Sequence, residues 1–295
     1  MHKMTLIQRE FEASRRHEFR PMRGHPKLVE LSPENVAKAE ANIRNDSAYI
    51  KSSDENAAPN KKYGGSTAYW MMKLKSVLID GKNVSPQIYR EYLSETVAAI
   101  DRDNSTHLNC DGGGREEMTR RLLEFPDKEL NEITRRMYLV EALRNPRTTK
   151  YSLIKTLSER TTAKGEKHNP RVNLSFASKF CHYACFYFFE GMEEQDNYSI
   201  YDSVVSKVLP LYCSHFNIPK LRCGNKDYVL YQETIDAIIN ASASDGKSGG
   251  PISRNGFDHL LWYYFKGRQE MVDEELRILR SQSRKECGRL KGAMK

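Results

Sequence analysis

The strongest constraint on the fold is a repeated helix-start motif, a serine followed by proline, with apolar residues at helical spacing behind it. Residues 32–34 (Ser-Pro-Glu) and 85–87 (Ser-Pro-Gln) each place a capping serine before a proline at the first helical position. Behind the second motif, apolar residues at 88, 89, 92, 93, 97 and 100 line one face of a helix. Because no segment alternates apolar and polar residues as a half-buried strand does, the sequence predicts an all-α fold.

The same signals predict helices along the whole chain. A third helix is expected to open at Pro126 and to end at Asn145-Pro146. Its apolar stripe comprises Leu130, Ile133, Met137, Val140 and Leu143. Further helices are expected near 4–20, 66–79, 115–124, 149–161, 174–189, 200–214, 229–241, 254–266 and 268–290. Segments rich in glycine, serine, asparagine or charge are expected to be loops at 46–65, 103–114, 161–170, 219–227 and 242–251.

The charge balance favours a polyanionic partner. The chain has 47 Lys and Arg against 39 Asp and Glu, a formal net charge of +8 and a pI near 9.0. Nucleic acid is the leading partner class, although basic proteins without a nucleic-acid role are common. The sequence has no run of about twenty apolar residues and no apolar signal region after Met1, so we expect a soluble cytoplasmic protein with no membrane partner.

The cysteines predict neither a disulfide framework nor a metal site. Six cysteines are scattered through a chain too long for a disulfide scaffold, so we expect reduced thiols. The spacing of Cys181, Cys185 and Cys213 fits neither a zinc ribbon nor an iron–sulfur loop. Residues 245–250 (Asp-Gly-Lys-Ser-Gly-Gly) lack the first glycine of a phosphate-binding loop and read as a connector. We expect no metal and no cofactor.

The segment with the clearest chemistry places one lysine and one carboxylate around an apolar helix. Residues 173–182 read Asn-Leu-Ser-Phe-Ala-Ser-Lys-Phe-Cys-His, so Lys179 follows a run of small residues. Aromatic residues make the rest of the helix apolar nearly all round, which predicts the core helix of its lobe. Asp202 follows Lys179 by 23 positions, between aromatic and β-branched residues. The pattern predicts that the lysine and the carboxylate are aimed at one spot.

Over about residues 165–215 this segment resembles the helix-hairpin-helix DNA glycosylases of the 8-oxoguanine and alkyl-base type. In that family a small-x-small-x-Lys pattern at a helix N-terminus lets backbone N–H groups approach a DNA phosphate, and an invariant aspartate opens the next helix. Ser175 and Ala177 stand where glycines are usual, and residues 190–196 lengthen the gap before the aspartate. The resemblance implies that Asp202 stabilises the sugar cation or activates the nucleophile, and that Lys179 is an amine able to attack the sugar.

These residues also have structural interpretations, which stay open from the sequence. Asp202 precedes an apolar helix, so it fits an N-terminal helix residue that interacts favourably with the helix dipole. As a nucleophile, Lys179 would need a neutral amine, which burial beside aromatic residues can favour. Its other interpretation is a phosphate contact or a solvated lysine. His182 fits a hydrogen-bonded core histidine.

The resemblance further implies a DNA-binding surface and a base pocket. DNA contacts are expected at Lys164, Lys167, Arg171, Asn173, Ser175 and Ala177. The basic residues of this set fit a solvated loop equally well. The pocket for an extruded base is expected at Tyr63, Trp70, His182, Tyr198 and Tyr201. For the segment that holds Tyr63 and Trp70, the other interpretation is an aromatic anchor of the N-terminal lobe.

The sequence thus predicts a bilobal architecture similar to that of helix-hairpin-helix glycosylases. An N-terminal helical lobe is expected at 1–145 and a hairpin lobe with C-terminal helices at 146–295, or the two form one integrated domain. The expected activity is excision of a modified or damaged base from double-stranded DNA to leave an abasic site, and a loose resemblance to bacterial defence glycosylases implies modified phage DNA as a substrate. The alternatives are a non-catalytic DNA-binding module and a metal-dependent nuclease, for which no carboxylate pair has a persuasive spacing.

Overall fold

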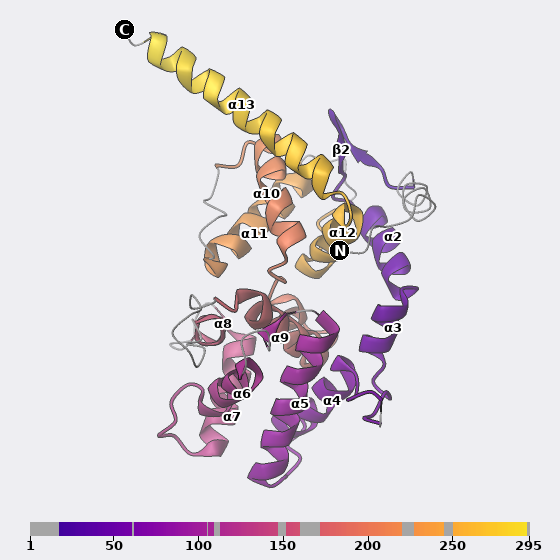
Figure 1. Ribbon diagram of the computed structural model, residues 1–295, viewed down its shortest axis with the longest axis vertical. Helices are drawn as coiled ribbons and strands as arrows, with labels where there is room; N and C mark the ends of the chain where they lie inside the picture. Colours follow the sequence, from indigo (N-terminus) through magenta and orange to yellow (C-terminus); the bar gives the residue numbers. More distant parts are fainter. Residues whose placement is uncertain are drawn as a thin grey trace. The chain divides into compact units, whose positions relative to one another are not determined.

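The described part of the chain is mostly helical, which confirms the predicted all-α class at that level (Figure 1). The computed structural model describes residues 18–60, 62–104, 106–108, 113–146, 152–159, 172–219, 227–244 and 250–293, and only the backbone of 283–293. The α-helices are α2 (Pro33–Arg44), α3 (Ser47–Ser53), α4 (Thr67–Leu78), α5 (Pro86–Asn104), α6 (Gly114–Glu124), α7 (Glu132–Arg144), α8 (Leu153–Ser158), α9 (Leu174–Phe188), α10 (Ser203–His215), α11 (Tyr228–Ser244), α12 (Arg254–Phe265) and α13 (Gln269–Ala293). Within the described ranges, no helix is both long and apolar enough to cross a membrane.

Contacts within the chain define two compact units. The central unit is Arg44–Tyr201, and the terminal unit combines Met1–Ile43 with Asp202–Lys295. The terminal unit is therefore built from both ends of the sequence, with the central unit inserted between them. The lobe boundary expected between residues 145 and 146 falls inside the central unit, between α7 and α8.

The central unit is organised around α9, as the apolar character of that helix predicts. Helix α9 packs against α4, α5, α7 and α8, and a 3₁₀ turn, η2 (Glu193–Asp196), follows it. Its buried side chains include Leu174, Phe176, Ala177, Phe180, Cys181, Ala184, Cys185 and Phe188. Other buried residues of the central unit include Met71, Leu74, Leu93, Val97, Leu122 and Leu143, each at most 2% exposed. The prediction of a core helix is confirmed.

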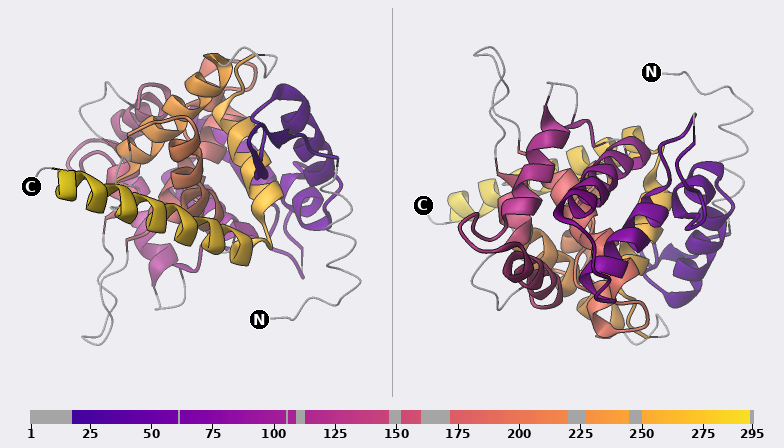
Figure 2. Two further views of the ribbon diagram at one scale, coloured as in Figure 1. Left: turned by 90° about the horizontal axis from the view of Figure 1, so that it is seen from above. Right: turned by 90° about the horizontal axis from the view of Figure 1, so that it is seen from below.

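The terminal unit is organised around α10. This helix packs against α11, α12 and α13, and Figure 2 shows α13 crossing it. Val208, Leu209 and Tyr212 of α10 are fully buried. The Tyr212 hydroxyl donates a hydrogen bond to the Val29 carbonyl at 2.8 Å, which fastens the N-terminal segment of the chain to α10.

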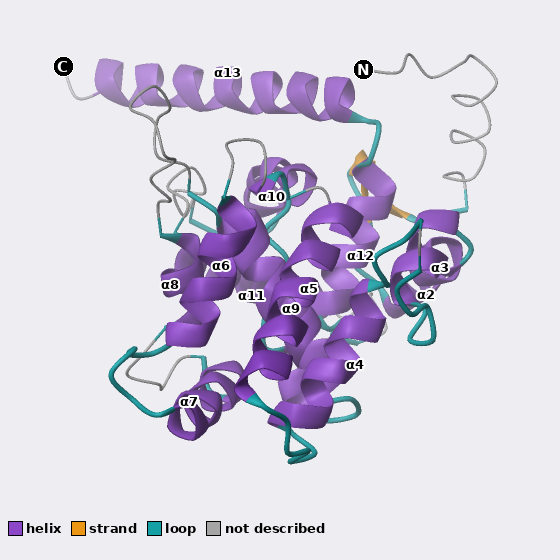
Figure 3. Ribbon diagram, turned by 60° about the horizontal axis from the view of Figure 1, so that its bottom comes forward, coloured by secondary structure: helices purple, strands orange, loops and turns teal. Residues whose placement is uncertain are grey.

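Two short strands in the terminal unit contradict the expectation of a chain without strands. β1 (Pro21–Met22) pairs antiparallel with β2 (His25–Val29), and both are orange in Figure 3. The turn between them contains Gly24 at φ 79°, a backbone conformation that glycine adopts without strain. β1 has only two residues, and in β2 the two buried residues are adjacent, so neither strand shows the alternation that predicts a strand.

The helix expected from Pro126 begins later, at Glu132, so this predicted boundary is wrong. Asn131 is the N-cap, and its side chain accepts the Thr134 N–H at 2.9 Å. The predicted stripe is also wrong in its first half, because Ile133 is 71% and Met137 68% exposed. The buried face of α7 consists of Leu139, Ala142 and Leu143.

The segment 46–65 was expected to be a loop, but α3 forms within it. Asp46 caps this helix by accepting the Ala48 N–H at 2.9 Å and the Tyr49 N–H at 3.3 Å. The aspartate that suggested a loop is thus the start signal of a short helix. Residues 4–17 of the expected first helix and the expected loop at 161–170 lie outside the described residues.

Candidate functional site

Asp202, the expected catalytic carboxylate, is the N-cap residue of α10 in the terminal unit. Its backbone is extended, with φ −112° and ψ 145°, and its Oδ1 accepts the Val204 N–H at 2.6 Å. The side chain is half-buried. The first turn of a helix carries partial positive charge, so it stabilises a carboxylate at this position. The expectation that Asp202 opens a helix is confirmed.

The phenol of Tyr231, on α11, lies beside Asp202. The Asp202 backbone forms a hydrogen bond to the Tyr231 hydroxyl group, and burial raises the pKa of this phenol well above its ordinary value. The negative charges of Asp258 and Asp202 raise it further. Tyr231 and Asp258 are each 3% exposed.

Lys179, the expected nucleophilic amine, lies in the second turn of α9 in the central unit. It is only 9% exposed, and its Nζ donates a hydrogen bond to the backbone carbonyl of Asn104 at 2.8 Å. Asn104 is the last residue of α5. The C-terminus of a helix carries partial negative charge, so the ammonium of Lys179 caps α5.

Asn104 is a site residue that the sequence did not reveal. Its Oδ1 accepts the Tyr183 hydroxyl at 2.6 Å while its carbonyl accepts Lys179, so one residue binds two side chains of α9. Burial raises the pKa of Tyr183, which keeps the phenol protonated as a donor. Asn104 lies 75 positions before Lys179 and inside a segment predicted to be a loop. No local pattern links the two residues, and only tertiary packing brings them together.

The small-x-small-x-Lys segment does not stand at a helix N-terminus as a unit. Asn173 is the N-cap of α9, Ser175 lies in its first turn, and the Ala177 N–H donates to the Asn173 carbonyl at 2.9 Å. The Ala177 amide is therefore part of the helix, and Lys179 lies a turn further along. The resemblance implied that free backbone N–H groups and the lysine lie together at one helix end, whereas here Lys179 lies inside the helix. Lys164, Lys167 and Arg171, the expected basic DNA contacts, lie outside the described residues.

Two residues expected in a base pocket are core residues of the central unit. His182 is 2% exposed, and its Nδ1 lies 2.8 Å from the Tyr198 carbonyl oxygen. Tyr198 is 1% exposed and donates its hydroxyl to the Ala142 carbonyl at 2.8 Å. Tyr201 is half-buried, and its N–H donates to Ser178 Oγ at 2.9 Å. The structure thus brings His182 and Tyr198 together and joins Tyr201 to the neighbour of Lys179.

The other two expected pocket residues form an aromatic anchor at the start of α4. Trp70 is 6% exposed and donates its indole N–H to the Gly64 carbonyl at 2.7 Å. Tyr63 is half-buried and has two cations over its ring, with Lys51 Nζ 4.0 Å and Arg102 Cζ 4.5 Å from the ring centroid. Gly65 has φ 86°, and a Cβ on it would lie 2.6 Å from the Trp70 indole nitrogen. This glycine lets the indole close over the turn.

The three described cysteines are buried free thiols. Burial raises the pKa values of Cys181 and Cys185, so these thiols are protonated and unreactive. In the part of the chain that the structure describes, no group of three or more His, Cys, Asp or Glu side chains is arranged to hold a metal ion.

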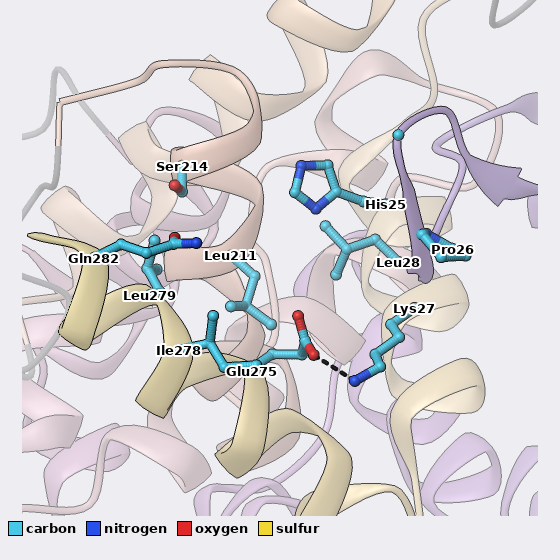
Figure 4. Close-up of a pocket in the computed structure, with 11 residues that line it drawn as sticks. His25, Pro26, Lys27, Leu28, Leu211, Ser214, Glu275, Ile278, Leu279 and Gln282 are labelled. Atoms are coloured by element: carbon cyan, nitrogen blue, oxygen red, sulfur yellow. Dashed lines mark hydrogen bonds and ion pairs between the residues drawn. The ribbon is translucent and has the colours of Figure 1, made fainter.

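Figure 4 shows a cavity of about 270 Å³ in the terminal unit, between β2, α10 and α13. Leu28, Leu211 and Ile278 supply its apolar lining, and Lys27 Nζ pairs with Glu275 Oε1 at 2.6 Å beside them. None of the expected site residues lines this cavity.

The expected catalytic pair is distributed over the two units, with Lys179 in the central unit and Asp202 in the terminal unit. The Lys179 amine lies at the C-terminus of α5 and the Asp202 carboxylate at the N-terminus of α10, so each charge is opposite in sign to the partial charge of the helix end that it meets. Comparison of the chain with protein-family models, curated proteins and solved structures found no match.

Proposed function

We propose that this protein is a monofunctional DNA glycosylase of the helix-hairpin-helix kind, which excises a modified or damaged base and leaves an abasic site. The observation that carries the proposal is the position of Asp202 as the N-cap of the helix that follows the Lys179 helix. That order of lysine helix, connection and helix-opening aspartate is the order implied by the resemblance. The net charge of +8 supports DNA as the partner.

In the proposed reaction, Asp202 stabilises positive charge that develops on the sugar. Cleavage of the bond between C1′ and the base leaves a cation-like sugar, and a nearby carboxylate lowers the energy of that transition state. Water then adds its hydroxyl to C1′, and its proton balances the charge of the departing base. Because one oxygen of Asp202 accepts the Val204 N–H, the carboxylate is held in one orientation for this role.

The environment of Lys179 favours water over the lysine as the nucleophile. A lysine that attacks C1′ must present a neutral amine to the sugar. The Lys179 side chain is buried, and its amine donates a hydrogen bond to a main-chain carbonyl at a helix C-terminus, so it is engaged in a contact within the central unit. In this proposal Lys179 is a structural cap of α5, and no covalent intermediate forms. Treatment of the reaction with borohydride, which reduces a Schiff base, is expected to trap no protein–DNA adduct.

The test is release of bases from DNA of differing modification by the wild type and by Asp202→Asn. The substrates include oxidised DNA, alkylated DNA and glucosylated phage DNA, and abasic sites are scored by alkaline cleavage. Asparagine caps a helix about as well as aspartate, so the substitution removes the charge and keeps the fold. Asp46→Asn is the matched control, because Asp46 is also an N-cap aspartate, on α3.

Abasic sites made by the wild type and Asp46→Asn but not by Asp202→Asn support the proposal and identify the substrate. A wild type that makes none on any of these substrates excludes it. Activity confined to plain oxidised DNA would keep the glycosylase and reject a role against modified phage DNA.

The second candidate function is a non-catalytic DNA-binding module. It is favoured by the structural roles that both expected catalytic residues have, since Lys179 caps α5 and Asp202 caps α10. It predicts salt-sensitive DNA binding that is unchanged in Asp202→Asn, with no base release from any substrate. Titration of labelled duplex DNA at several salt concentrations, beside the base-release assay, distinguishes the two functions.

A further inference from the structure

The last helix, α13, divides its charges between its two halves. Residues 269–276 contain four carboxylates and no base, namely Glu270, Asp273, Glu274 and Glu275. Residues 277–293 contain six bases and one carboxylate. Figure 1 shows α13 running past α10, with its C-terminal half extending beyond that helix. The acidic half and the basic half of α13 therefore have different surroundings within the terminal unit.

The acidic half anchors the helix to its own unit. Helix α13 packs against α10, and its side chains Val272 and Leu276 are 2% and 8% exposed. Lys27, on β2, pairs with Glu275 at 2.6 Å and lies 3.9 Å from Glu274. These contacts use the apolar face of α13 and part of its negative charge inside the terminal unit.

The basic half places four of its bases along one face of the helix, at intervals of three, four and seven residues. We call these four residues the basic stripe: Arg277, Arg280, Arg284 and Lys291. At 3.6 residues per turn, the four positions fall within about 60° of one another around the helix axis and span about 21 Å along it. The helix is continuous through them to Ala293. Arg277 and Arg280 are exposed, and neither pairs with a carboxylate among the described residues.

The stability of α13 does not explain the basic stripe. The partial negative charge at the C-terminus of a helix acts on bases in the last turn. Arg277 and Arg280 lie 16 and 13 positions before the last helical residue, Ala293, which is outside that range. Like charges four positions apart, as at Arg280 and Arg284, destabilise a helix. An anionic partner that neutralises the stripe removes this repulsion.

We propose that the basic stripe of α13 binds the phosphate backbone of duplex DNA, an inference that rests on the proposed function for the identity of the partner. Phosphates of one DNA strand recur about every 3.4 Å along the duplex axis, so a stripe of about 21 Å faces about six of them. The guanidinium group of arginine matches the geometry of phosphate oxygens. Contacts of this kind position a protein on DNA and read no sequence.

The burial of the apolar face of α13 favours DNA over a lipid surface as the anionic partner. A helix that lies on a membrane inserts its apolar face between the lipids. In α13 the apolar residues Val272 and Leu276 are buried within the terminal unit, so they are not free to insert. The stripe offers charge without an apolar face beside it, which suits a polyanion that stays in water.

The test is equilibrium binding of labelled duplex DNA at several salt concentrations by the wild type and by the double variant Arg277→Gln/Arg280→Gln. Glutamine forms helices about as well as arginine, so the substitutions remove charge and keep the helix. Each lost phosphate contact is expected to lower the slope of log K against log salt by about 0.9. We expect the double variant to bind every duplex sequence about 10- to 100-fold more weakly near 0.1 M salt.

The matched control is Lys82→Gln/Arg90→Gln, which removes two exposed bases from the central unit and changes the net charge equally. The control is expected to bind DNA as the wild type does. Unchanged affinity and slope in Arg277→Gln/Arg280→Gln, or an equal loss in the control, overturns the inference. Urea denaturation of the free protein is expected to show no loss of stability in Arg277→Gln/Arg280→Gln. A loss of stability that accounts for the weaker binding assigns the arginines to the fold and also overturns it.

Two further measurements separate this inference from its rivals and from the proposed function. Wild-type protein that binds phosphatidylserine vesicles but no DNA overturns the inference in favour of a lipid surface. Base release is measured on the same DNA. Stripe-dependent DNA binding without base release keeps the inference and rejects the glycosylase. Base release with DNA binding unchanged in Arg277→Gln/Arg280→Gln keeps the glycosylase and rejects the inference.

Discussion

The C-terminus of α5 and the N-terminus of α10 use charged side chains in opposite ways. At the end of α5, the Lys179 ammonium caps a main-chain carbonyl, with Tyr183 bound to the same asparagine. At the start of α10, the Asp202 carboxylate caps a main-chain N–H. Both arrangements match the helix dipole. They differ in burial, because Lys179 is 9% exposed whereas Asp202 is half-buried.

This difference separates a structural group from a candidate reactive one. A buried ammonium that donates to a fixed carbonyl must break that bond and expose itself before it can reach a substrate. A half-buried carboxylate on a helix cap needs no such rearrangement to face one. The comparison therefore teaches that the lysine of the resemblance stabilises the central unit, and that the chemistry proposed here depends on Asp202.

The largest expected effect is on the rate of base release in Asp202→Asn. Loss of a group that stabilises transition-state charge costs about 100- to 1,000-fold in kcat. The fold is expected to change little, with an unfolding free energy within about 0.5 kcal/mol of wild type, because asparagine retains the cap. Single-turnover base release and urea denaturation measure the two quantities. A parallel loss of stability and rate would show that the residue only holds the helix.

A smaller effect, on stability alone, is expected for Lys179→Met. Methionine keeps an unbranched apolar side chain but removes the ammonium, so the α5 carbonyl loses a charged hydrogen bond worth about 1.5–3 kcal/mol. Urea denaturation is expected to show this loss in unfolding free energy. Lys155→Met, at an exposed position on α8, is the control and should stay within about 0.5 kcal/mol of wild type.

The rate of base release by the folded fraction of Lys179→Met tests whether Lys179 has a catalytic role in addition to its structural one. We expect it to equal that of the wild type, because the lysine takes no part in the proposed chemistry. An inactive but fully stable Lys179→Met protein would reverse the assignment and return the lysine to the role of nucleophile.

Removal of the second donor to Asn104, in Tyr183→Phe, is expected to cost about 1 kcal/mol of unfolding free energy. The hydroxyl makes a 2.6 Å hydrogen bond to Asn104 Oδ1, and phenylalanine leaves that oxygen with one donor fewer. Denaturation of Tyr183→Phe, Lys179→Met and the double variant gives their coupling energy. A non-zero coupling is expected because both side chains bind one residue, and strict additivity would show that Asn104 does not connect them.

The smallest expected difference between the two regions is in their response to alkaline pH, which is expected to destabilise both. Burial raises the folded-state pKa of Tyr183 and of Tyr231 above the ordinary value near 10. The protonated phenol is thus favoured in the folded state, and the stability it contributes is complete below about pH 10 and is lost as the pH rises beyond it. Phenolate absorbance against pH is expected to show these tyrosines ionising only as the protein unfolds. Ionisation of either one in the folded protein would mean that its surroundings admit water.

Helix starts that rest on a local cap were largely predictable from sequence. The proline-led motifs at 33 and 86 open α2 and α5 where expected, and Asp202 opens α10. The start of α7 was missed because Pro126 resembles a first helical residue, whereas the capping bond is made by Asn131. The two-residue strand β1 was missed because it is shorter than any recognisable period.

The sequence by itself determined the helical fold class, the apolar character of α9 and the place of Asp202 at a helix start. These follow from capping and periodicity, which act between residues a few positions apart. Only the tertiary structure decided that the Lys179 amine meets Asn104, 75 positions away, and that Tyr231 meets Asp202. Such contacts depend on how whole helices pack against one another. The packing joins residues that are far apart in the sequence, and a pattern of neighbouring residues does not predict it.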